Sequence, residues 1–364
     1  MANPTNSYVD PSIAADTGAG TIGDPAGDLQ GWLDRMTRDS SNGDRINIKA
    51  GTSEILSGAL SLATYGSPGA GKPLILQGYT AAAMDGGIGS LDFNSGIFTL
   101  LAATTFVHFY DLKFHNASPT TYAVNIGAVQ VIKGCHFTDI TGSALTVGYA
   151  SVIGNRFDDI SGAGVTVPST SPVNIIFNDF RNGTKAFTYA ITTPSSPVLT
   201  VARNTISLDG ASVGINVGYY VTVMNNSILS SAGTGTGILQ FGAHTGCRIF
   251  NNLVEGFSGA GGRGFHLSSG PQTLFRNNAA FNNTTSYSSL GADYDSDDNE
   301  SLGSSPFDKS GADTYANRFT YLAPSTVGNV RTGYPSGSNI AKGAVQPAAI
   351  AAGGGRLVNG GLVG

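Results

Sequence analysis

The middle of the chain contains a column of asparagines that recurs once per repeat. The column consists of Cys135, Asn155, Asn178, Asn204, Asn226, Asn252 and Asn278, so successive members lie 20–26 residues apart. Two positions after the first six members stands a large apolar residue: Phe137, Phe157, Phe180, Ile206, Ile228 and Val254. Phe114 adds one earlier repeat, with Leu112 at the asparagine position. A period of this length predicts stacked, similar units that each contact only their neighbours.

Both columns have a physical reason in a solenoid of short strands. Stacked coils place equivalent residues about 4.8 Å apart, so residues of the same type contact one another in neighbouring coils. An asparagine at a bend tolerates unusual φ and ψ, and its amide can bond the amides above and below. Alternating stretches such as Gly162-Ala-Gly-Val-Thr-Val indicate strands with one buried face. Asparagine ladders also occur in leucine-rich repeats, but the leucine pattern of those repeats is missing here. We therefore predict an all-β, right-handed, single-stranded parallel β-helix.

Both ends of such a solenoid need a cap. The segment 25–37 predicts a helix whose apolar face is formed by Leu29, Trp32, Leu33 and Met36 and closes the N-terminal end. We expect three regions: an N-terminal cap over residues 1–50, the β-helix over 51–290, and a C-terminal cap with an apolar docking arm over 291–364. In that arm, the stretch 293–300 predicts an acidic loop. The last part, 343–364, carries one charged side chain, Arg356.

Composition excludes several classes of protein. The net charge is −5, charged residues make up 12% of the chain, and no basic stripe is present, so we do not expect nucleic-acid binding. The sequence contains no run of about 18 apolar residues, so we expect no membrane-spanning helix. The first residues lack the basic and apolar parts of a signal peptide, which favours cytoplasmic synthesis; a trimmed signal and secretion is the alternative. The two cysteines, Cys135 and Cys247, fall about five coils apart, roughly 24 Å at 4.8 Å per coil, which is too far for a disulfide.

Several short motifs of this sequence resemble those of a known group of proteins. Tyr8-Val-Asp-Pro, Gly18-Ala-Gly-Thr, Lys49-Ala-Gly-Thr and Pro73-Leu-Ile-Leu-Gln-Gly-Tyr look like the opening of right-handed parallel β-helix proteins. Ser305-Pro-Phe and Gly343-Ala-Val-Gln are similar to their ending. That superfamily includes pectate-lyase-like and chondroitinase-like enzymes and many bacteriophage virion proteins. The resemblance implies the fold, but it does not choose between these activities, because this fold carries many functions.

The candidate catalytic residues flank the phenylalanine column and should point outward. Stacking the repeats places Lys113, His136, Arg156 and Asp179 on one line, and His115, Thr138, Asp158 and Arg181 on the next. From this group we select Lys113, His136, Arg156, Asp158, Asp179 and Arg181. A polysaccharide lyase needs a cation for the uronate, a base for the C5 proton and an acid for the leaving oxygen. A hydrolase would instead use two carboxylates. The alternative is a solvated face whose mixed charges happen to be in register.

No cofactor is predicted with one exception, a weak calcium candidate. Asp293, Asp295 and Asp297 have the spacing of the first ligands of a calcium loop, but Asp298 stands where such a loop needs glycine. The stretch from Gly66 to Lys72 is close to a phosphate-binding loop. There Pro73 replaces the required hydroxyl residue and a strand, not a helix, follows, so we do not expect nucleotide binding.

Three functions are consistent with these features. The first is a structural protein of a bacteriophage particle, a capsid decoration or tail-associated spike, assembled in the host cytoplasm with other virion proteins and with copies of itself; trimers are common among such proteins. The second is a lyase or depolymerase acting on acidic polysaccharides. The third is a non-catalytic glycan-binding protein in which exposed tyrosines such as Tyr219 and Tyr220 stack on sugars.

Overall fold

The fold is that of a computed structural model, which describes residues 4–302 apart from short internal segments. These segments are 14–16, 70, 98, 101–105, 120, 127–129, 169–171, 194–198, 241–245, 268–272, 289–294 and 298. The predicted arm over 343–364 therefore lies outside the described residues. Among the described residues, no helix has the length and apolar character needed to cross a membrane.

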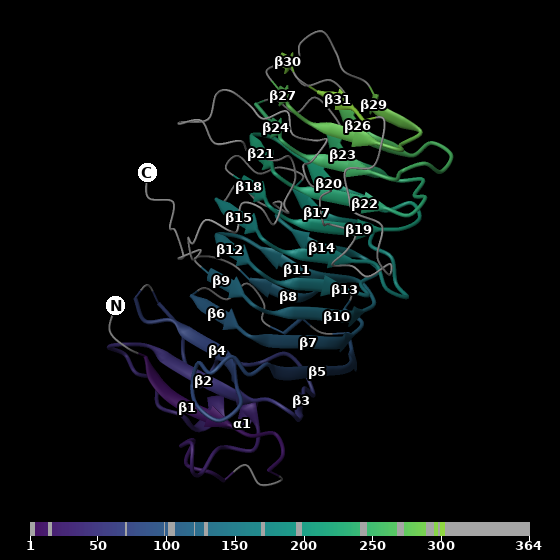
Figure 1. Cartoon of the computed structure of the whole chain (residues 1–364). Helices are drawn as coiled ribbons and strands as arrows, with labels where there is room; N and C mark the ends of the chain where they lie inside the picture. The colour runs from purple at the N-terminus through teal and green to yellow at the C-terminus, as the bar shows by residue number, and fades with distance from the viewer. Residues whose placement is uncertain are drawn as a thin grey trace, which may run out of the picture.

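The described strands form three parallel sheets that wind around one core, as Figure 1 shows. Sheet 1 contains β1 (Thr5–Val9), β2 (Asp44–Lys49), β4 (Leu74–Tyr79), β6 (Val107–Tyr110), β9 (Gln130–Lys133), β12 (Ala150–Ile153), β15 (Val173–Ile176), β18 (Leu199–Ala202), β21 (Val221–Met224), β24 (Arg248–Phe250), β27 (Leu274–Arg276) and β30 (Asp295–Asp297). Sheet 2 contains β3 (Ser53–Ile55), β5 (Gly89–Gly96), β7 (Leu112–Ala117), β10 (His136–Ile140), β13 (Arg156–Asp158), β16 (Asp179–Arg181), β19 (Thr205–Leu208), β22 (Ser227–Ser230), β25 (Leu253–Glu255), β28 (Ala279–Phe281) and β31 (Glu300–Ser301). Sheet 3 contains β8 (Tyr122–Ile126), β11 (Ser143–Val147), β14 (Ala163–Thr166), β17 (Tyr189–Thr193), β20 (Val213–Val217), β23 (Thr236–Gln240), β26 (Arg263–Leu267) and β29 (Thr285–Ser288). From β6 to β29 each coil adds one strand to each sheet, whereas the coils before β6 and the last described coil add strands to sheets 1 and 2 alone. This arrangement confirms the predicted parallel β-helix.

The asparagine column forms a continuous hydrogen-bonded ladder. The side-chain amide of Asn178 donates to Asn204 Oδ1 at 3.0 Å, and Asn204 donates in the same way to Asn226 at 2.9 Å. Each side-chain oxygen also accepts the backbone N–H of the preceding member, as in Asn178 N–H to Asn204 at 2.9 Å. The ladder runs from Asn155 and continues past Asn278 to Asn299, one coil further than the sequence pattern indicated.

The unusual backbone conformation lies one residue before the ladder and not at the ladder itself. Phe177, Arg203 and Asn225 have φ values of 58°, 57° and 55°, whereas the ladder asparagines that follow them are not among the residues with positive φ. The bend is therefore made by the preceding residue in the left-handed region. The ladder asparagine then has its amide free to bond the neighbouring coils.

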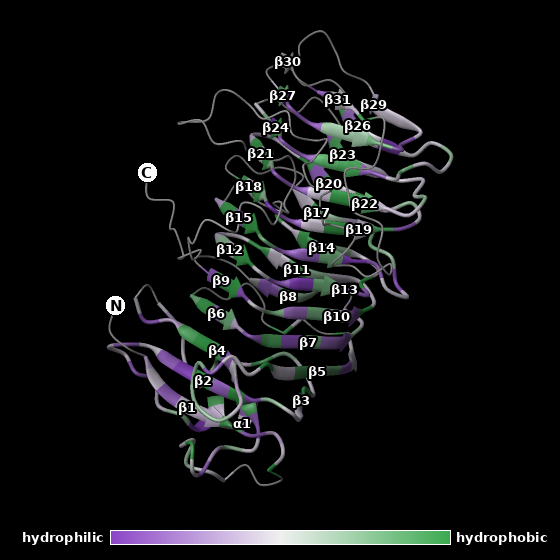
Figure 2. Cartoon of the chain, viewed as in Figure 1, coloured by the Kyte–Doolittle hydropathy of each residue, from purple (hydrophilic) through white to green (hydrophobic). Residues whose placement is uncertain are grey.

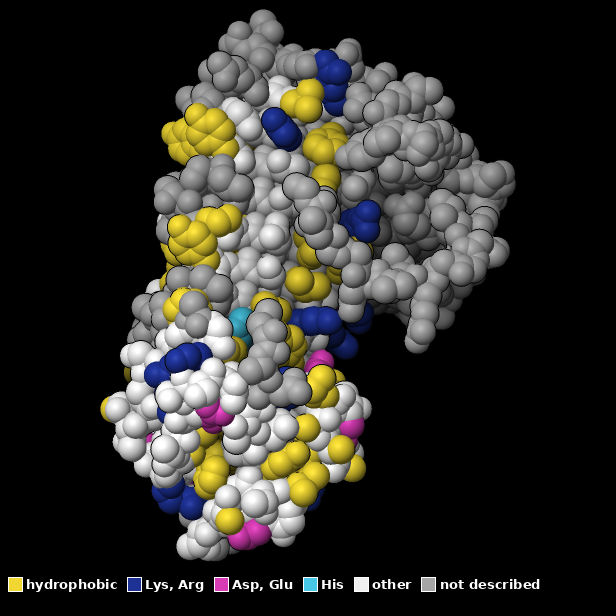
Figure 3. Space-filling model, turned by 90° about the vertical axis from the view of Figure 1, so that its left-hand side faces the viewer, with side chains coloured by type: hydrophobic (Ala, Val, Ile, Leu, Met, Phe, Trp, Pro, Cys, Tyr) yellow, Lys and Arg dark blue, Asp and Glu magenta, His cyan; other side chains and the backbone are white. Residues whose placement is uncertain are grey.

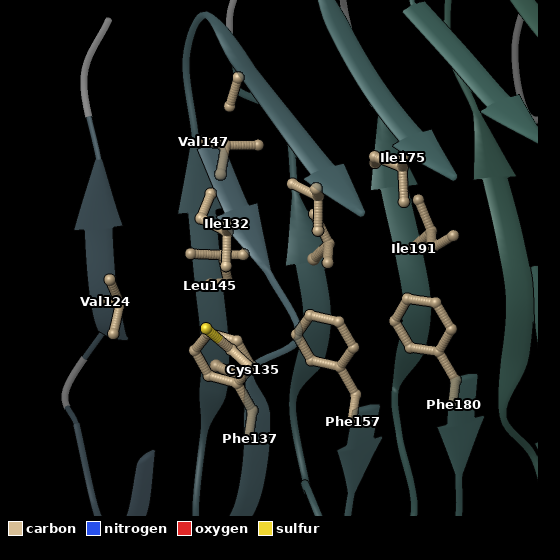
Figure 4. Packing of buried hydrophobic residues seen from close by; sticks show 14 of the residues in the cluster. Val124, Ile132, Cys135, Phe137, Leu145, Val147, Phe157, Ile175, Phe180 and Ile191 are labelled. Atoms are coloured by element: carbon tan, nitrogen blue, oxygen red, sulfur yellow. The ribbon is translucent and has the colours of Figure 1, made fainter. Parts of the chain in front are cut away.

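The interior is filled by the predicted aromatic column. Phe114, Phe137, Phe157 and Phe180 pair across neighbouring strands of sheet 2 and are fully buried. Their ring centroids lie 4.7, 4.8 and 4.7 Å apart, with interplanar angles of 12°, 4° and 7°. Figure 4 shows Phe137, Phe157 and Phe180 stacked beside aliphatic side chains from the other sheets. Cys135 and Cys247 are buried free thiols, as predicted.

The N-terminal helix α1 (Leu29–Arg35) is shorter than the predicted 25–37. It begins at Leu29 because the Asp28 carboxylate accepts the N–H groups of Gln30 and Gly31, while Ala26 is engaged in a bridge with Val9. Leu29 and Leu33 are fully buried in the end of the core, as the predicted capping role requires. The strands β1 and β2 belong to sheet 1, so the solenoid already begins within the region 1–50 that we had expected to be a cap.

The acidic stretch 293–300 is not simply a loop, which corrects the prediction. Strand β30 pairs with β27, and β31 pairs with β28, so this stretch supplies most of another coil. The pairing is possible because Asn299 continues the ladder and Ser296 takes the register position of the buried Phe275.

Candidate functional site

The charged face of sheet 2 is built by the register of four neighbouring strands. Lys113, His136, Arg156 and Asp179 are Cα partners in successive coils. His115 pairs with Thr138, and Asp158 pairs with Arg181. Because the phenylalanines between these two lines point inward, strand alternation directs both lines outward. The structure thus places all six residues that the sequence proposed as catalytic on one face, spread over four coils.

Most of these charges are paired with one another. The Asp158 carboxylate lies 2.9 Å from His136 Nε2 and 2.5 Å from Arg156 Nη2. Asp179 Oδ2 accepts hydrogen bonds from Arg181 Nε at 2.8 Å and Nη2 at 2.5 Å, and its Oδ1 accepts one from Thr205 at 3.1 Å. Arg156 keeps 48% of its side chain exposed, so it remains available to a ligand while it holds Asp158.

The two carboxyl groups have opposite pKa shifts. Burial favours the neutral form of Asp158, but hydrogen bonds from His136 and Thr138 and the charge of Arg156 outweigh it and lower the pKa to about 2. For Asp179, burial is the dominant cause and raises the pKa above its usual range, although Arg181 acts against this shift. Asp158 is therefore ionised at neutral pH, whereas burial favours the neutral form of Asp179.

His115 extends the charged face towards the N-terminal end. Its Nε2 lies 3.0 Å from Ser90 Oγ and 3.3 Å from Ser53 Oγ, and the two hydroxyls are 2.9 Å apart. Burial and the nearby charge of Lys113 lower the pKa of His115, so the ring is neutral at pH 7. Lys113 itself forms no ion pair with the residues that the structure describes.

Sequence reasoning did not find the contribution of Ser53 and Ser90. They lie in β3 and β5, which are 37 residues apart and outside the part of the chain where the asparagine column shows the period. No residue pattern connects them with His115 before the coils are stacked.

A loop over residues 182–188 stands beside the charged face. Lys185 Nζ lies 2.6 Å from Asp139 Oδ1, two coils away. Asp159 Oδ1 accepts hydrogen bonds from Thr184 Oγ1 and from the Lys185 N–H, both at 2.7 Å. Asp139 and Asp159 therefore hold this loop against the coils.

The calcium candidate receives no geometry that would test it. Asp293 lies outside the described residues, and the backbone of Asp295 and Asp297 belongs to strand β30. Within the described part of the chain, no group of three or more His, Cys, Asp or Glu side chains could hold a metal ion. Tyr219 and Tyr220, the candidate sugar-stacking residues, are 40% and 54% exposed at the turn before β21.

Comparisons with known proteins agree with this architecture. Residues 122–280 match the family model of the right-handed β-helix region. A crystal structure of pectate lyase Pel9A superposes with a TM-score of 0.64 over 95% of this chain and 97% of the enzyme, at 14% sequence identity. This chain has the right-handed parallel β-helix fold.

Two further structures share the fold of this β-helix protein. A rhamnogalacturonan lyase has a TM-score of 0.51 at 12% identity, covering 83% of this chain and 90% of the lyase. The lacto-N-biosidase of Eubacterium ramulus has a TM-score of 0.50 at 10% identity, covering 82% of this chain and 68% of that protein. No curated protein matches the sequence. Identities this low establish a common fold and leave the activity to be argued from the site.

Proposed function

We propose that this protein binds an acidic polysaccharide along the outer face of sheet 2 and cleaves it by β-elimination. The observation that supports the proposal is the charged face itself, in which cations, a neutral histidine and two differently shifted carboxyl groups lie in register over four coils. At about 4.8 Å per coil the face extends for roughly 15 Å, long enough for several sugar units.

The elimination would proceed through three groups of the face. Lys113 and Arg156 neutralise the uronate carboxylate, which makes the C5 proton more acidic. His115, neutral at pH 7, accepts that proton at Nε2, and the serine hydroxyls that now contact this atom give way to the substrate. The electron pair of the C5–H bond forms the C4–C5 double bond while the C4–O bond breaks. A water molecule protonates the leaving oxygen, because Asp179 lies three coils, about 14 Å, beyond His115 and is already held by Arg181.

Asp158 has a positioning role in this scheme. Its pKa of about 2 keeps it ionised, so it cannot supply a proton at neutral pH. It accepts a hydrogen bond from His136 and forms an ion pair with Arg156, and thereby orients both side chains towards the substrate. The names of the similar structures support a glycan-acting protein, since two are lyases of polysaccharides and the third is a biosidase.

The test is a turnover assay on polygalacturonate, rhamnogalacturonan and other acidic polysaccharides, read by the ultraviolet absorbance of the unsaturated product. We expect His115→Ala to lower kcat by about 10²–10⁴-fold, the usual contribution of a positioned base. Lys113→Ala should lower kcat by about 10²–10³-fold, the usual loss when one group that stabilises developing negative charge is removed. Arg248→Ala, a change of an exposed cation on sheet 1, serves as the control and should leave turnover unchanged. Binding without turnover would contradict the elimination and leave a glycan-binding protein. Absence of both binding and turnover would contradict the whole proposal.

A structural role in a bacteriophage particle is a separate proposal, compatible with the first because a spike can also cleave glycans. It is based on the low charge of the chain and on the fold, in which three sheets pair most of the backbone and thereby resist unfolding. Mass spectrometry of purified particles tests it, and particles that lack this chain would contradict it.

A further inference from the structure

The outer face of sheet 1 carries an unexpected column of apolar side chains. Cα pairing aligns the members of this apolar column in five successive coils: Ile153, Ile176, Ala202, Met224 and Phe250. The residues immediately before them, such as Val152 and Ile175, are fully buried in the core. Strand alternation therefore places the apolar column on the outer face of sheet 1. Figure 2 shows β12, β15, β18 and β21 coloured mainly as hydrophobic.

The surroundings of the apolar column are polar. On the same strands, two positions earlier, the outward residues are Ser151, Asn174, Thr200, Thr222 and Arg248. The register continues the column into Lys133 at one end and Arg276 at the other. Figure 3, which views this side of the molecule, shows hydrophobic side chains between Lys and Arg side chains. The column is half-buried at Ile153, Ile176, Met224 and Phe250 and buried at Ala202, and an apolar strip with a polar border is typical of an interaction surface.

The turn beside Ile176 adds a second unusual feature. Phe177 is 49% exposed and has a φ of 58°, a conformation that bulky residues rarely adopt. The Arg203 guanidinium stacks on its ring, 5.3 Å from the centroid. An exposed aromatic held in this conformation next to the apolar column widens the apolar surface by one turn.

The length and composition of the rest of the chain identify an occupant. Residues 303–364 follow the last coil, and the stretch 343–364 is almost entirely Gly, Ala, Val, Leu and Ile with one charged side chain, Arg356. From Leu302 to Ile153 is six coils, about 29 Å at 4.8 Å per coil, whereas the 40 residues between 303 and 342 can extend beyond 100 Å. An apolar segment of this length within reach has a strong reason to leave water.

We propose that residues 343–364 dock on the apolar column of their own chain. The contact would cover Ile153, Ile176, Met224 and Phe250 and leave the charged face of sheet 2 open. It therefore stands independently of the function proposed above. The competing occupant is a second copy of this chain, which would cover the column with its own apolar column or with its own residues 343–364.

The test is a disulfide cross-link in the full-length chain carrying Met224→Cys and Leu357→Cys, since the native Cys135 and Cys247 are buried. Mild oxidation followed by peptide mass spectrometry should give an intramolecular cross-link. The matched pair Thr192→Cys with Leu357→Cys places the first thiol on the outer face of sheet 3. This pair should give a cross-link yield at least about tenfold lower, because docking raises the effective concentration of the second thiol only at the apolar column.

Two further measurements make the result decisive. Mixing isotopically light and heavy chains before oxidation separates cross-links within a chain from those between chains; a product only between chains would overturn the proposal in favour of a second copy. Ile176→Lys should abolish the Met224 cross-link, whereas Asn174→Lys, on the same strand but beside the column, should not. Equal yields at Met224 and Thr192, or no effect of Ile176→Lys in a folded protein, would also overturn it.

Discussion

Replacing Asn204 by alanine should destabilise the protein more than almost any other single polar substitution. Asn204 lies in the centre of the ladder and is fully buried. Its side-chain oxygen accepts the Asn178 N–H and the Asn178 side-chain amide, at 2.9 and 3.0 Å. Its side-chain nitrogen donates to the Ile175 carbonyl and to Asn226 Oδ1, both at 2.9 Å.

The magnitude follows from the groups that lose these bonds. The Asn178 side-chain amide keeps its bond to the Val152 carbonyl, and Asn226 Oδ1 keeps the backbone N–H of residue 204. The Asn178 N–H and the Ile175 carbonyl lose the Asn204 side chain. With about 1–3 kcal/mol for each buried group left unsatisfied, the expected loss is about 2–6 kcal/mol. This is a large share of the ~5–15 kcal/mol by which most domains are stable.

The assay compares urea unfolding midpoints, followed by circular dichroism, of Asn204→Ala and Asn174→Ala. Asn174 is an exposed asparagine on the outer face of sheet 1, so its replacement should change stability by about 0.5 kcal/mol or less. Hydrogen exchange at the Asn178 N–H supplies a local measurement that does not require two-state unfolding. Equal midpoints for the two variants, or unchanged exchange at Asn178, would refute the view that the ladder holds the coils together.

Three further predictions concern the core, the backbone and pH. Phe157→Ala should lower the free energy of unfolding by about 3–5 kcal/mol because it opens the centre of the ring stack. Phe177→Ala, at an exposed site, should change it by at most about 0.5 kcal/mol. Thermal unfolding compares the two variants, and equal losses would contradict the core assignment. Gly256→Ala should destabilise the protein by more than about 1 kcal/mol, because φ is +88° and the new Cβ would lie 1.8 Å from a backbone oxygen. In the control Gly58→Ala the new Cβ meets nothing within 4 Å. Similar melting temperatures for the two variants would contradict this reasoning. The lowered pKa of Asp158, about 2 against an ordinary 3.8, contributes stability that is present above pH 3.8 and is lost as the pH falls through 2. Asp158→Asn should therefore be less stable than the parent at pH 6 in urea unfolding, and most of this difference should be gone at pH 2. A difference independent of pH would exclude this cause.

The sequence predicts the fold well where side chains repeat from coil to coil. The phenylalanine column appears in the structure with the expected members, because a buried ring can stack only on a ring in the same register. The charged face follows from the same alignment, since Lys113 and Arg156 are fixed by the phenylalanines beside them. A slip of one residue would have moved every one of these side chains to the other face.

The parts that the sequence did not predict depend on contacts between irregular segments. The helix begins at Leu29 because of a capping carboxylate and a bridge to β1, neither of which has a periodic signal. The coil formed by β30 and β31 was hidden by its acidic composition, although Asn299 has the role of a ladder residue. The Ser53, Ser90 and His115 contacts join coils of unequal length, so no constant spacing reveals them.

Different positions within each coil have different roles, which explains how one backbone presents both a charged face and an apolar column. The ladder and the ring stack use only inward or bend positions, and they fix the distance and register between coils. The outward positions of each strand contribute little to that register, so their composition can differ from sheet to sheet. In sheet 2 these positions carry the paired charges around Asp158, and in sheet 1 they carry the apolar column from Ile153 to Phe250. A polar residue placed in the apolar column should therefore leave the fold intact and alter only what binds there, whereas the same residue at a ring-stack position should prevent folding.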